Sequence, residues 1–243
     1  MKQRRRGEGE KELKGTTSKY RRPRAGLAKS LFVSQNIRSI NSNKDEFQKF
    51  LTILDCVEIV ALQEVWSGIT PPKLQGYQDP FMKCRRKQKG GGVAFYVADH
   101  LKYKEVQSPY IQNYMETIAI DVFTKGQINR YINVYRPPNQ ECTKEIFLSF
   151  LKTLPIDPTM VTTVCGDFNI DIKQPENYYI IEFFQERGLH SMVDVATRVS
   201  KTTKGTSMTI VDHLYTNKPK VDCVVMETDI TDHYTPCLVL ERG

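Results

Sequence analysis

Six apolar runs of this sequence each end or begin at a residue that can bind a cation or move a proton. Those residues are Asn36, Glu64, Tyr135, Asp167 with Asn169, Asp212, and Asp232 with His233. Loops at strand ends are presented by a rigid scaffold, and catalytic groups are common there. Hydrolysis of a phosphodiester needs these residue types, because it requires a hard cation, an activated water and stabilisation of developing negative charge.

A cation site is predicted around Glu64 and Asn36. Their side chains offer carboxylate and amide oxygens, which suit Mg²⁺, and Mg²⁺ typically takes only one or two carboxylates and leaves positions for water and phosphate. We expect Mg²⁺ here, with Mn²⁺ as an alternative. The cation would polarise a phosphate oxygen and offset the charge of the leaving group.

The other polar residues fit the proton transfers of the same reaction. Asp167 could activate or orient the attacking water, and Asn169 could fix that carboxylate or the phosphate through amide hydrogen bonds. His233 could donate to the phosphate as charge builds, with Asp212 holding its tautomer. Tyr135 could donate a hydrogen bond to a phosphate oxygen or lie near the leaving group.

Each of these signals also has an ordinary structural explanation. Asn36 alone is typical of a turn, and Tyr135 alone is typical of a half-buried strand. The Gly-Asp-x-Asn pattern at 166–169 is also common turn chemistry. The order and the combination favour the catalytic interpretation, because one reaction would need all of these positions to be filled together.

Short strands and a few amphipathic helices must position these residues. Helical spacing of apolar residues is found at 47–54, 147–154 and 180–189, with Gly188 as a stop. Helices separate groups of strands, and none lies between the last strands. This order predicts an α/β (α+β) fold of two sheets stacked face to face, with helices on their outer sides. Nine strands are predicted, over residues 31–37, 58–63, 92–98, 117–123, 128–135, 161–166, 208–216, 221–227 and 235–241.

The net charge of +7 is concentrated in the first 30 residues. They hold 11 Lys and Arg against 3 Glu, a surplus of +8, whereas the rest of the chain holds 24 basic and 25 acidic groups. Because residues 1–30 contain few large apolar side chains, we expect a disordered basic arm there, followed by one domain over 31–243. The arm is a candidate for nuclear import or phosphate binding, or a solvated tail.

Cysteine usage and hydropathy exclude several classes of protein. The six cysteines form no CxxC pair and follow no secretory signal, so we expect free thiols, neither a zinc cluster nor a disulfide framework. No apolar run approaches the roughly 18 residues of a membrane span. The expectation is an intracellular protein without a membrane partner.

Seven segments occur in a familiar order along the chain: SQNIRSI (34–40), ALQEVW (61–66), KGGGVAFYV (89–97), NVYRPPN (133–139), CGDFNID (165–171), MTIVDHLYTN (208–217) and TDH (231–233). Over residues 31–241 the sequence thereby resembles the endonuclease/exonuclease/phosphatase superfamily. The GGGVAFYV, VYRPP, INSNKDEF and TIVDHLYTN strings resemble the apurinic-like endonuclease of non-LTR retrotransposons in particular. The resemblance implies a four-layered α/β/β/α sandwich of two mixed sheets flanked by helices, with the site at one end of the paired sheets.

Two motifs depart from the pattern of the superfamily. Abasic-site repair enzymes usually carry a Trp-Asn pair in the first motif, whereas here Gln35 precedes Asn36 and Arg38 follows two positions later. This difference disfavours repair activity. The last motif, usually Ser-Asp-His, is Thr-Asp-His here, and Thr231 keeps the hydroxyl group.

The resemblance also implies a role for each site residue. Asn36, Glu64 and Asp232 are implied as metal-site residues. The implied catalytic residues are Asp167, Asn169, Asp212, His233 and Tyr135. Two basic segments, KCRRKQK (83–89) and KTTKGTS (201–207), are candidates for a DNA-facing surface or simply solvated loops. We expect nucleic-acid contacts from Arg85, Arg86, Arg136, Lys201 and Lys204.

The function implied by the resemblance is Mg²⁺-dependent nicking of DNA, which generates a 3′-hydroxyl for target-primed reverse transcription. We expect a monomer located in the nucleus, with DNA as partner and a reverse-transcriptase domain of a parent polypeptide as a further candidate partner. Two alternatives stay open. The first is another phosphoester hydrolase on the same scaffold, such as an abasic-site repair nuclease or a lipid or nucleotide phosphatase. The second is a catalytically dead nucleic-acid-binding remnant, against which the intact motifs count.

Overall fold

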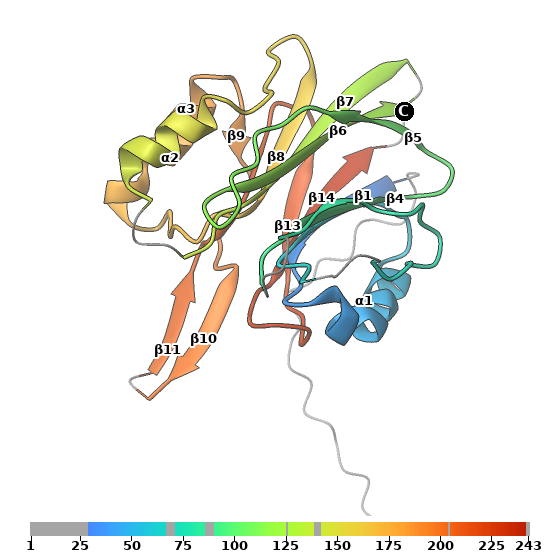
Figure 1. Ribbon diagram of the computed structural model, residues 1–243, viewed down its shortest axis with the longest axis horizontal. Coiled ribbons are helices and arrows are strands. Elements are labelled where there is room, and N and C mark those ends of the chain that lie inside the picture. Colours follow the sequence, from blue (N-terminus) through green and yellow to red (C-terminus); the bar gives the residue numbers. More distant parts are fainter. Residues whose placement is uncertain are drawn as a thin grey trace, which may run out of the picture.

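Two mixed six-stranded sheets stack face to face and carry helices on their outer sides, so the four-layered sandwich is confirmed (Figure 1). The computed structural model describes residues 29–66, 71–85, 90–124, 126–138, 142–203 and 205–241. The expected basic arm therefore lies outside the described residues except for Lys29 and Ser30. Arg86 and Lys204 also lie outside them.

The first sheet is built mainly from the two ends of the chain. Its strands are β1 (Lys29–Asn36), β2 (Val57–Gln63), β3 (Phe81–Lys83), β4 (Val93–Val97), β13 (Asp222–Met226) and β14 (Thr235–Glu241). Their order across the sheet is β13-β14-β1-β2-β4-β3. The central pair β1–β2 is parallel, while β14 runs antiparallel to β1.

The second sheet takes the middle of the chain. Its strands are β5 (Lys102–Val106), β6 (Glu116–Thr124), β7 (Gln127–Tyr135), β8 (Val161–Asp167), β9 (His190–Ser191) and β12 (Asp212–Thr216). Their order is β5-β6-β7-β8-β12-β9, in which β7–β8 is parallel and β12 runs antiparallel to β8. A separate hairpin of β10 (Arg198–Thr202) and β11 (Gly205–Thr209) projects away from the sheets (Figure 1).

Among the described residues, three α-helices cover the sheets: α1 (Ile40–Leu54), α2 (Lys144–Leu151) and α3 (Tyr179–Gln185), the last preceded by a 3₁₀ turn, η1 (Pro175–Asn177). α1 lies against the first sheet, and α2 and α3 lie against the second (Figure 1). Side-chain oxygens of Ser39 and Thr143 accept hydrogen bonds from the backbone of the first turns of α1 and α2, which satisfies donors that a helix start leaves free. No helix in the described part of the chain is long and apolar enough to cross a membrane.

The core follows the two-residue alternation of the strands. Phe32, Ile59 and Ala61 belong to the core shared with the second sheet, whereas Val33 and Val60 belong to the cluster under α1. Burial on both faces explains why these strands are apolar almost without interruption. Between the sheets the rings of Phe32 and Tyr131 stack with centroids 5.2 Å apart, which joins the two layers.

Every predicted strand overlaps a strand of the structure, but the run at 208–216 is divided. β11 ends at Thr209 and β12 begins at Asp212, because the backbone N–H groups of Val211 and Asp212 donate to the Thr197 hydroxyl and not to a neighbouring strand. The prediction of one strand there was therefore wrong. It also missed β3, β5, β9 and β10, all of which are short and lie at sheet edges or in the hairpin.

The parallel pairs decide where functional groups gather. The carboxyl ends of parallel strands meet at one edge of a sheet, and an antiparallel neighbour begins at the same edge. The edge thus combines the ends of β1, β2, β7 and β8 with the beginnings of β12 and β14.

Candidate active site

The polar residues at these strand ends contact one another across the two sheets. Asn36, at the end of β1, donates through Nδ2 to Glu64 Oε1 (3.0 Å) and to Asp167 Oδ2 (2.8 Å). The Tyr135 hydroxyl, at the end of β7, donates to the same Glu64 oxygen at 3.1 Å. Glu64 itself has a left-handed backbone (φ 52°), a conformation that non-glycine residues rarely adopt and that is common at functional sites.

Asp167 is the most constrained carboxylate of the group. It is fully buried, and besides Asn36 it accepts from the backbone N–H of Asn169 (2.9 Å) and from Asn169 Nδ2 (3.1 Å). The preceding Gly166 is required by packing, since a Cβ there would lie 1.8 Å from the Val134 carbonyl oxygen on β7. Burial, reinforced by the negative charge of Asp212, raises the pKa of Asp167 to about 7.

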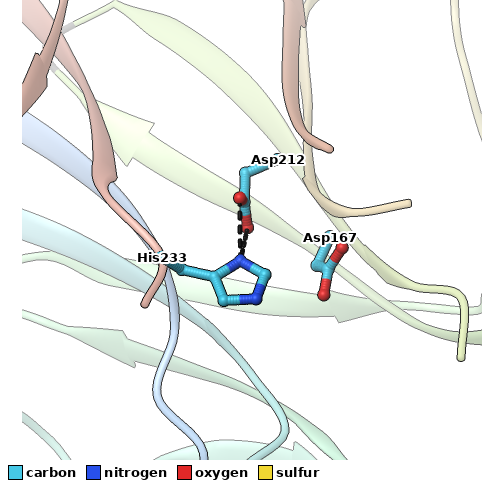
Figure 2. Close-up of side chains that lie close together, drawn as sticks. All are labelled: Asp167, Asp212 and His233. Carbon is cyan, nitrogen blue, oxygen red and sulfur yellow. Dashed lines mark hydrogen bonds and ion pairs between the residues drawn. The ribbon is translucent and has the colours of Figure 1, made fainter. Parts of the chain in front are cut away.

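His233 and Asp212 form a buried pair beside Asp167 (Figure 2). The imidazole Nδ1 lies 2.9 Å from Asp212 Oδ2 and 3.0 Å from Oδ1. Burial opposes the imidazolium form, but the charge and hydrogen bond of Asp212 outweigh it and raise the pKa of His233 to about 9. His233 is therefore a cation at neutral pH.

Thr231 and Gln35 fix the loop that carries His233. The Thr231 hydroxyl donates to the Asn36 carbonyl at 3.1 Å and accepts from the His233 N–H at 3.1 Å. Gln35 Nε2 donates to the carbonyls of Asn36 and His233, and its Oε1 accepts from the Thr235 hydroxyl. The hydroxyl retained in the Thr-Asp-His motif thus ties the histidine loop to β1.

The donor set suits a divalent cation. One ligand atom from each of Asp167, Asp212 and His233 lies within 4.8 Å of the others, so the described residues include a possible metal-binding group. The imidazolium form of His233 has no lone pair to offer, so this group presents only carboxylate oxygens to a cation. Asp167 and Asp212 place two carboxylates side by side, and a cation would offset their negative charge. The Glu64 carboxylate lies close by, because Asn36 Nδ2 donates to both Glu64 and Asp167.

Glu116 lies beside the site, but it was not predicted from the sequence. It begins β6 opposite Tyr135, is fully buried, and accepts from Arg85 Nε (2.5 Å) and from the Gly92 N–H (2.5 Å). The Arg85 guanidinium in turn lies 5.9 Å from the centre of the Tyr135 ring. An acidic residue beginning an otherwise apolar strand was the signal available in the sequence.

The residues expected to bind nucleic acid are placed differently from one another. Lys201 is exposed on the hairpin strand β10, whereas the Arg85 side chain is only 12% exposed. Arg136 is buried, and its guanidinium donates to the carbonyls of Phe168 (3.4 Å) and Cys142 (3.2 Å). An inward guanidinium cannot reach a strand outside, so this position counts against the expected DNA contact of Arg136.

Asp232 departs most from the role expected for it. Its carboxylate forms ion pairs with Arg38 at 2.8 Å and with Arg198 at 3.0 Å, neither of which was expected at the site from the sequence. The other expected metal and catalytic residues gather at the shared edge, joined by hydrogen bonds or, for the His233–Asp212 pair, by lying within 4.8 Å of Asp167. Asp232 lies beside them with two arginines. A carboxylate so neutralised is a weak candidate for a metal ligand.

Comparison with known proteins gives the following matches. A sequence profile described as the Endonuclease/Exonuclease/phosphatase family matches residues 33–233. A search of curated protein sequences finds no match. Among solved structures, the endonuclease domain of TRAS1, a telomere-specific non-LTR retrotransposon, is 17% identical with a TM-score of 0.66, covering 87% of this chain and 98% of that one.

Two further structures contain DNA. TDP2 from D. rerio, complexed with a single-strand DNA product, is 14% identical with a TM-score of 0.60, covering 87% of this chain and 98% of that one. The 3′ phosphatase NExo from Neisseria, bound to a product DNA hairpin, is 16% identical with a TM-score of 0.61, covering 87% and 99%. At these identities the similarity establishes the shared fold.

Proposed function

The chain belongs to the endonuclease/exonuclease/phosphatase family, and on that premise we propose that it is a Mg²⁺-dependent endonuclease that nicks DNA. Its nicks would provide the 3′-hydroxyl for target-primed reverse transcription, as expected for an endonuclease of retrotransposon type. The proposal rests chiefly on one observation: Asn36 joins the carboxylates of Glu64 and Asp167 from two different sheets, beside the buried His233–Asp212 pair.

In this proposal Asp167 orients and deprotonates the attacking water. Three N–H donors, from Asn36 and Asn169, fix its carboxylate and favour the ionised form. The pKa of about 7 matches a general base near neutral pH, which needs to be ionised yet basic enough to take a proton. Asn169 Nδ2 donates to the Arg136 carbonyl at 2.9 Å. The backbone of Arg136 thereby helps to position Asn169.

His233 is the positive group in the proposed mechanism. Asp212 accepts the Nδ1 proton, so Nε2–H is the donor directed away from this pair and available to a phosphate oxygen. Because the charge is in place before the reaction, stabilising the transition state requires no reorganisation. The Tyr135 hydroxyl, whose pKa burial and the nearby Glu64 raise, stays protonated, and it would donate to the phosphate in place of its present hydrogen bond to Glu64.

The residues that would hold the divalent cation are Glu64 and Asn36, next to the Asp167 carboxylate that Asn36 contacts. When bound, the cation supplies charge that polarises the phosphate and offsets the leaving oxygen. Asp232, expected from the sequence as a metal residue, is left out of this set because two guanidiniums already neutralise it. The proposed ligand atoms are oxygens, which suit Mg²⁺ and Mn²⁺ alike, and Mg²⁺ is proposed because the family resemblance implies it.

DNA as the substrate is supported by the comparisons and by the surface beside the site. The similar structures include a retrotransposon endonuclease domain and two proteins solved with DNA products. The hairpin β10–β11 projects beside the histidine loop and exposes Lys201, which would contact a DNA backbone. Nuclear localisation and a monomeric state remain predictions from the resemblance.

Nicking of supercoiled plasmid with and without Mg²⁺ tests the proposal. We expect conversion to open circles with Mg²⁺, no conversion in EDTA, and conversion slowed by roughly 10²–10⁴-fold with the Asp167→Asn variant. The same preparations are offered an abasic-site duplex and a small phosphomonoester. Faster turnover of either than of intact plasmid would replace the nicking proposal with repair or phosphatase activity, and no turnover of any substrate would favour the inactive remnant.

A further inference from the structure

Two arginines from distant parts of the chain meet at one carboxylate beside the catalytic histidine. Arg38 Nη1 lies 2.8 Å from Asp232 Oδ1, and its Nη2 donates to Oδ2 at 3.3 Å. Arg198 Nε donates to the same Oδ2 at 3.0 Å. Asp232 Oδ1 is 3.9 Å from His233 Nε2, so this cluster adjoins the nitrogen assigned to the phosphate.

The cluster carries more positive charge than its ion pairs need. Two guanidiniums on one carboxylate leave a net charge of +1, beside the His233–Asp212 pair, whose charges offset each other. The side chains of Arg38 and Arg198 are 38% and 33% exposed, so solvent and solutes can reach them. One arginine would be enough to neutralise Asp232. The second brings a like charge close, which favours the approach of an anion.

The backbone around Arg38 is strained in a way that presents its side chain. Arg38 and Ser39 both have left-handed conformations, with φ of 43° and 83°. The surrounding structure enforces this turn, since the N–H of Arg38 donates to Asn36 Oδ1 and that of Ser39 donates to the Glu64 carbonyl. Strain of this kind persists where neighbouring contacts fix it, and it collects at functional sites.

Arg198 is held just as firmly, at the base of the projecting hairpin. The N–H of Val199 donates to the Asp232 carbonyl at 3.0 Å, and the N–H of Tyr234 donates to the Thr197 carbonyl at 2.6 Å. The first strand of the hairpin is thereby paired to the loop that carries His233. A DNA strand leaving the site along the hairpin would pass the two arginines first.

We propose that Arg38 and Arg198 form a subsite for a phosphate of the DNA backbone. This phosphate neighbours the cleaved phosphate on the same strand, and Asp232 positions both guanidiniums. This inference rests on the proposed endonuclease function. A guanidinium presents N–H groups in a planar fork that matches phosphate oxygens, and Arg198 shows only its Nε contact among the described residues. Asp232 then acts by holding arginines, not by binding the cation.

Binding of a fluorescent duplex in EDTA, where no cleavage can occur, tests the subsite directly. Affinity is measured by anisotropy over a range of salt for the parent, Arg38→Gln, Arg198→Gln and the double variant. The slope of log affinity against log salt should fall by about 0.9 for each phosphate that a variant no longer neutralises, to the same extent on any duplex sequence. Lys104→Gln, an exposed cation on the edge strand β5, is the matched control and should keep the parent slope.

Arg→Lys variants and thermal melts guard against a merely structural effect. Arg38→Lys keeps the charge and should retain most of the salt slope. The subsite is supported if Arg38→Gln lowers the salt slope and Arg38→Lys does not, while thermal melts show that both variants are folded. Nicking should show the same loss as a raised KM for plasmid. Parent-like slopes in the double variant would overturn the subsite. A parent that binds DNA with an arginine-dependent slope but never nicks it would instead overturn only the endonuclease function.

Discussion

Aspartates 167 and 232 lie near the same histidine, yet their surroundings drive their acidities in opposite directions. Asp167 is sealed from water beside Asp212, and burial raises its pKa to about 7. Asp232 is part-buried, which alone would raise its pKa, but the hydrogen bond from Arg198 and the charges of His233 and Arg38 lower it. One is therefore suited to taking a proton near neutral pH, and the other to remaining a permanent anion that holds arginines.

Asp167→Asn should reduce nicking by roughly 10²–10⁴-fold, since an amide cannot take the proton of the attacking water. Initial rates on supercoiled plasmid at saturating Mg²⁺ measure the loss, and circular dichroism confirms that the variant is folded. Glu64→Gln and His233→Ala should give losses of similar size. Double variants should lose little more than single ones, because residues that act as a unit are not additive. A near-parent rate for Asp167→Asn would remove the assigned base.

The same residues should give the metal-free protein a falling stability as pH rises. The folded pKa of Asp167 is raised above its ordinary value, so the folded state binds this proton more tightly and loses that advantage between about pH 4 and pH 7. The raised pKa of His233 likewise contributes stability that is fully present below its ordinary value of 6.5 and lost as pH rises through about 9.

Urea unfolding in EDTA from pH 5 to pH 9.5 checks this dependence. We expect the free energy of unfolding to fall by about 1–3 kcal/mol over the range, at 1.36 kcal/mol for each unit of pKa difference and discounted for the coupling between the groups. His233→Ala should flatten the part above pH 6.5, and Asp167→Asn the part below pH 7. Identical profiles for parent and variants would show that neither group titrates as assigned.

Individual strands contribute to the site through the residues at their ends. β6 places Glu116 opposite Tyr135, and the segment before β4 brings Arg85 and Gly92 onto that carboxylate. The buried ion pair thereby holds the Arg85 guanidinium 5.9 Å from the centre of the Tyr135 ring. This arrangement accounts for Gly91, since a Cβ there would clash with the Arg85 guanidinium that Glu116 holds.

Glu116→Gln should destabilise the protein by about 3–5 kcal/mol, because it leaves the Arg85 guanidinium buried without a counter-charge. Urea unfolding at pH 7 measures the change. Glu46→Gln breaks the exposed Lys49–Glu46 pair of α1 and is the matched control, for which we expect no measurable change. A loss no larger than the control would mean that Arg85 finds another partner or reaches solvent.

At the scale of the whole molecule, the charge and the catalytic fold occupy different parts of the chain. Residues 1–28 hold 10 Lys and Arg against 3 Glu, whereas the first strand pairing of the described structure joins Lys29 to Glu241. The core clusters begin at Leu31 and Phe32. Folding and long-range attraction to DNA should therefore be separable.

Deleting residues 1–28 should leave cooperative urea unfolding unchanged and weaken DNA binding. The deletion removes a surplus of +7, and the salt slope should fall by about 0.9 for each DNA phosphate that these residues neutralise in the parent. Anisotropy titration in EDTA measures the slope, and plasmid nicking at low salt checks that the site still works. An unchanged slope would place the DNA contacts entirely within residues 29–243.

The sequence by itself determined the strands that carry the site and most of the residues in it. Apolar runs with a polar residue at the end are a local pattern, and Asn36, Glu64, Asp167 and His233 were found from it because a strand and its terminal residue are adjacent in the chain. The family pattern added the order of the motifs. Short strands such as β5 and β9 were not predicted. A few residues at a sheet edge show too little alternation of apolar and polar side chains to be distinguished from a loop.

The tertiary structure alone decided which of the remaining charged residues belong together. Asp232 meets Arg38 across 194 positions of sequence through the pairing of β14 with β1, and Glu116 meets Arg85 across 31. Such pairings follow from the burial of whole strands, a free energy summed over the two sheets that no local segment encodes. For the same reason the sequence could show that Arg136 is basic, but only the packed structure could turn its guanidinium inward.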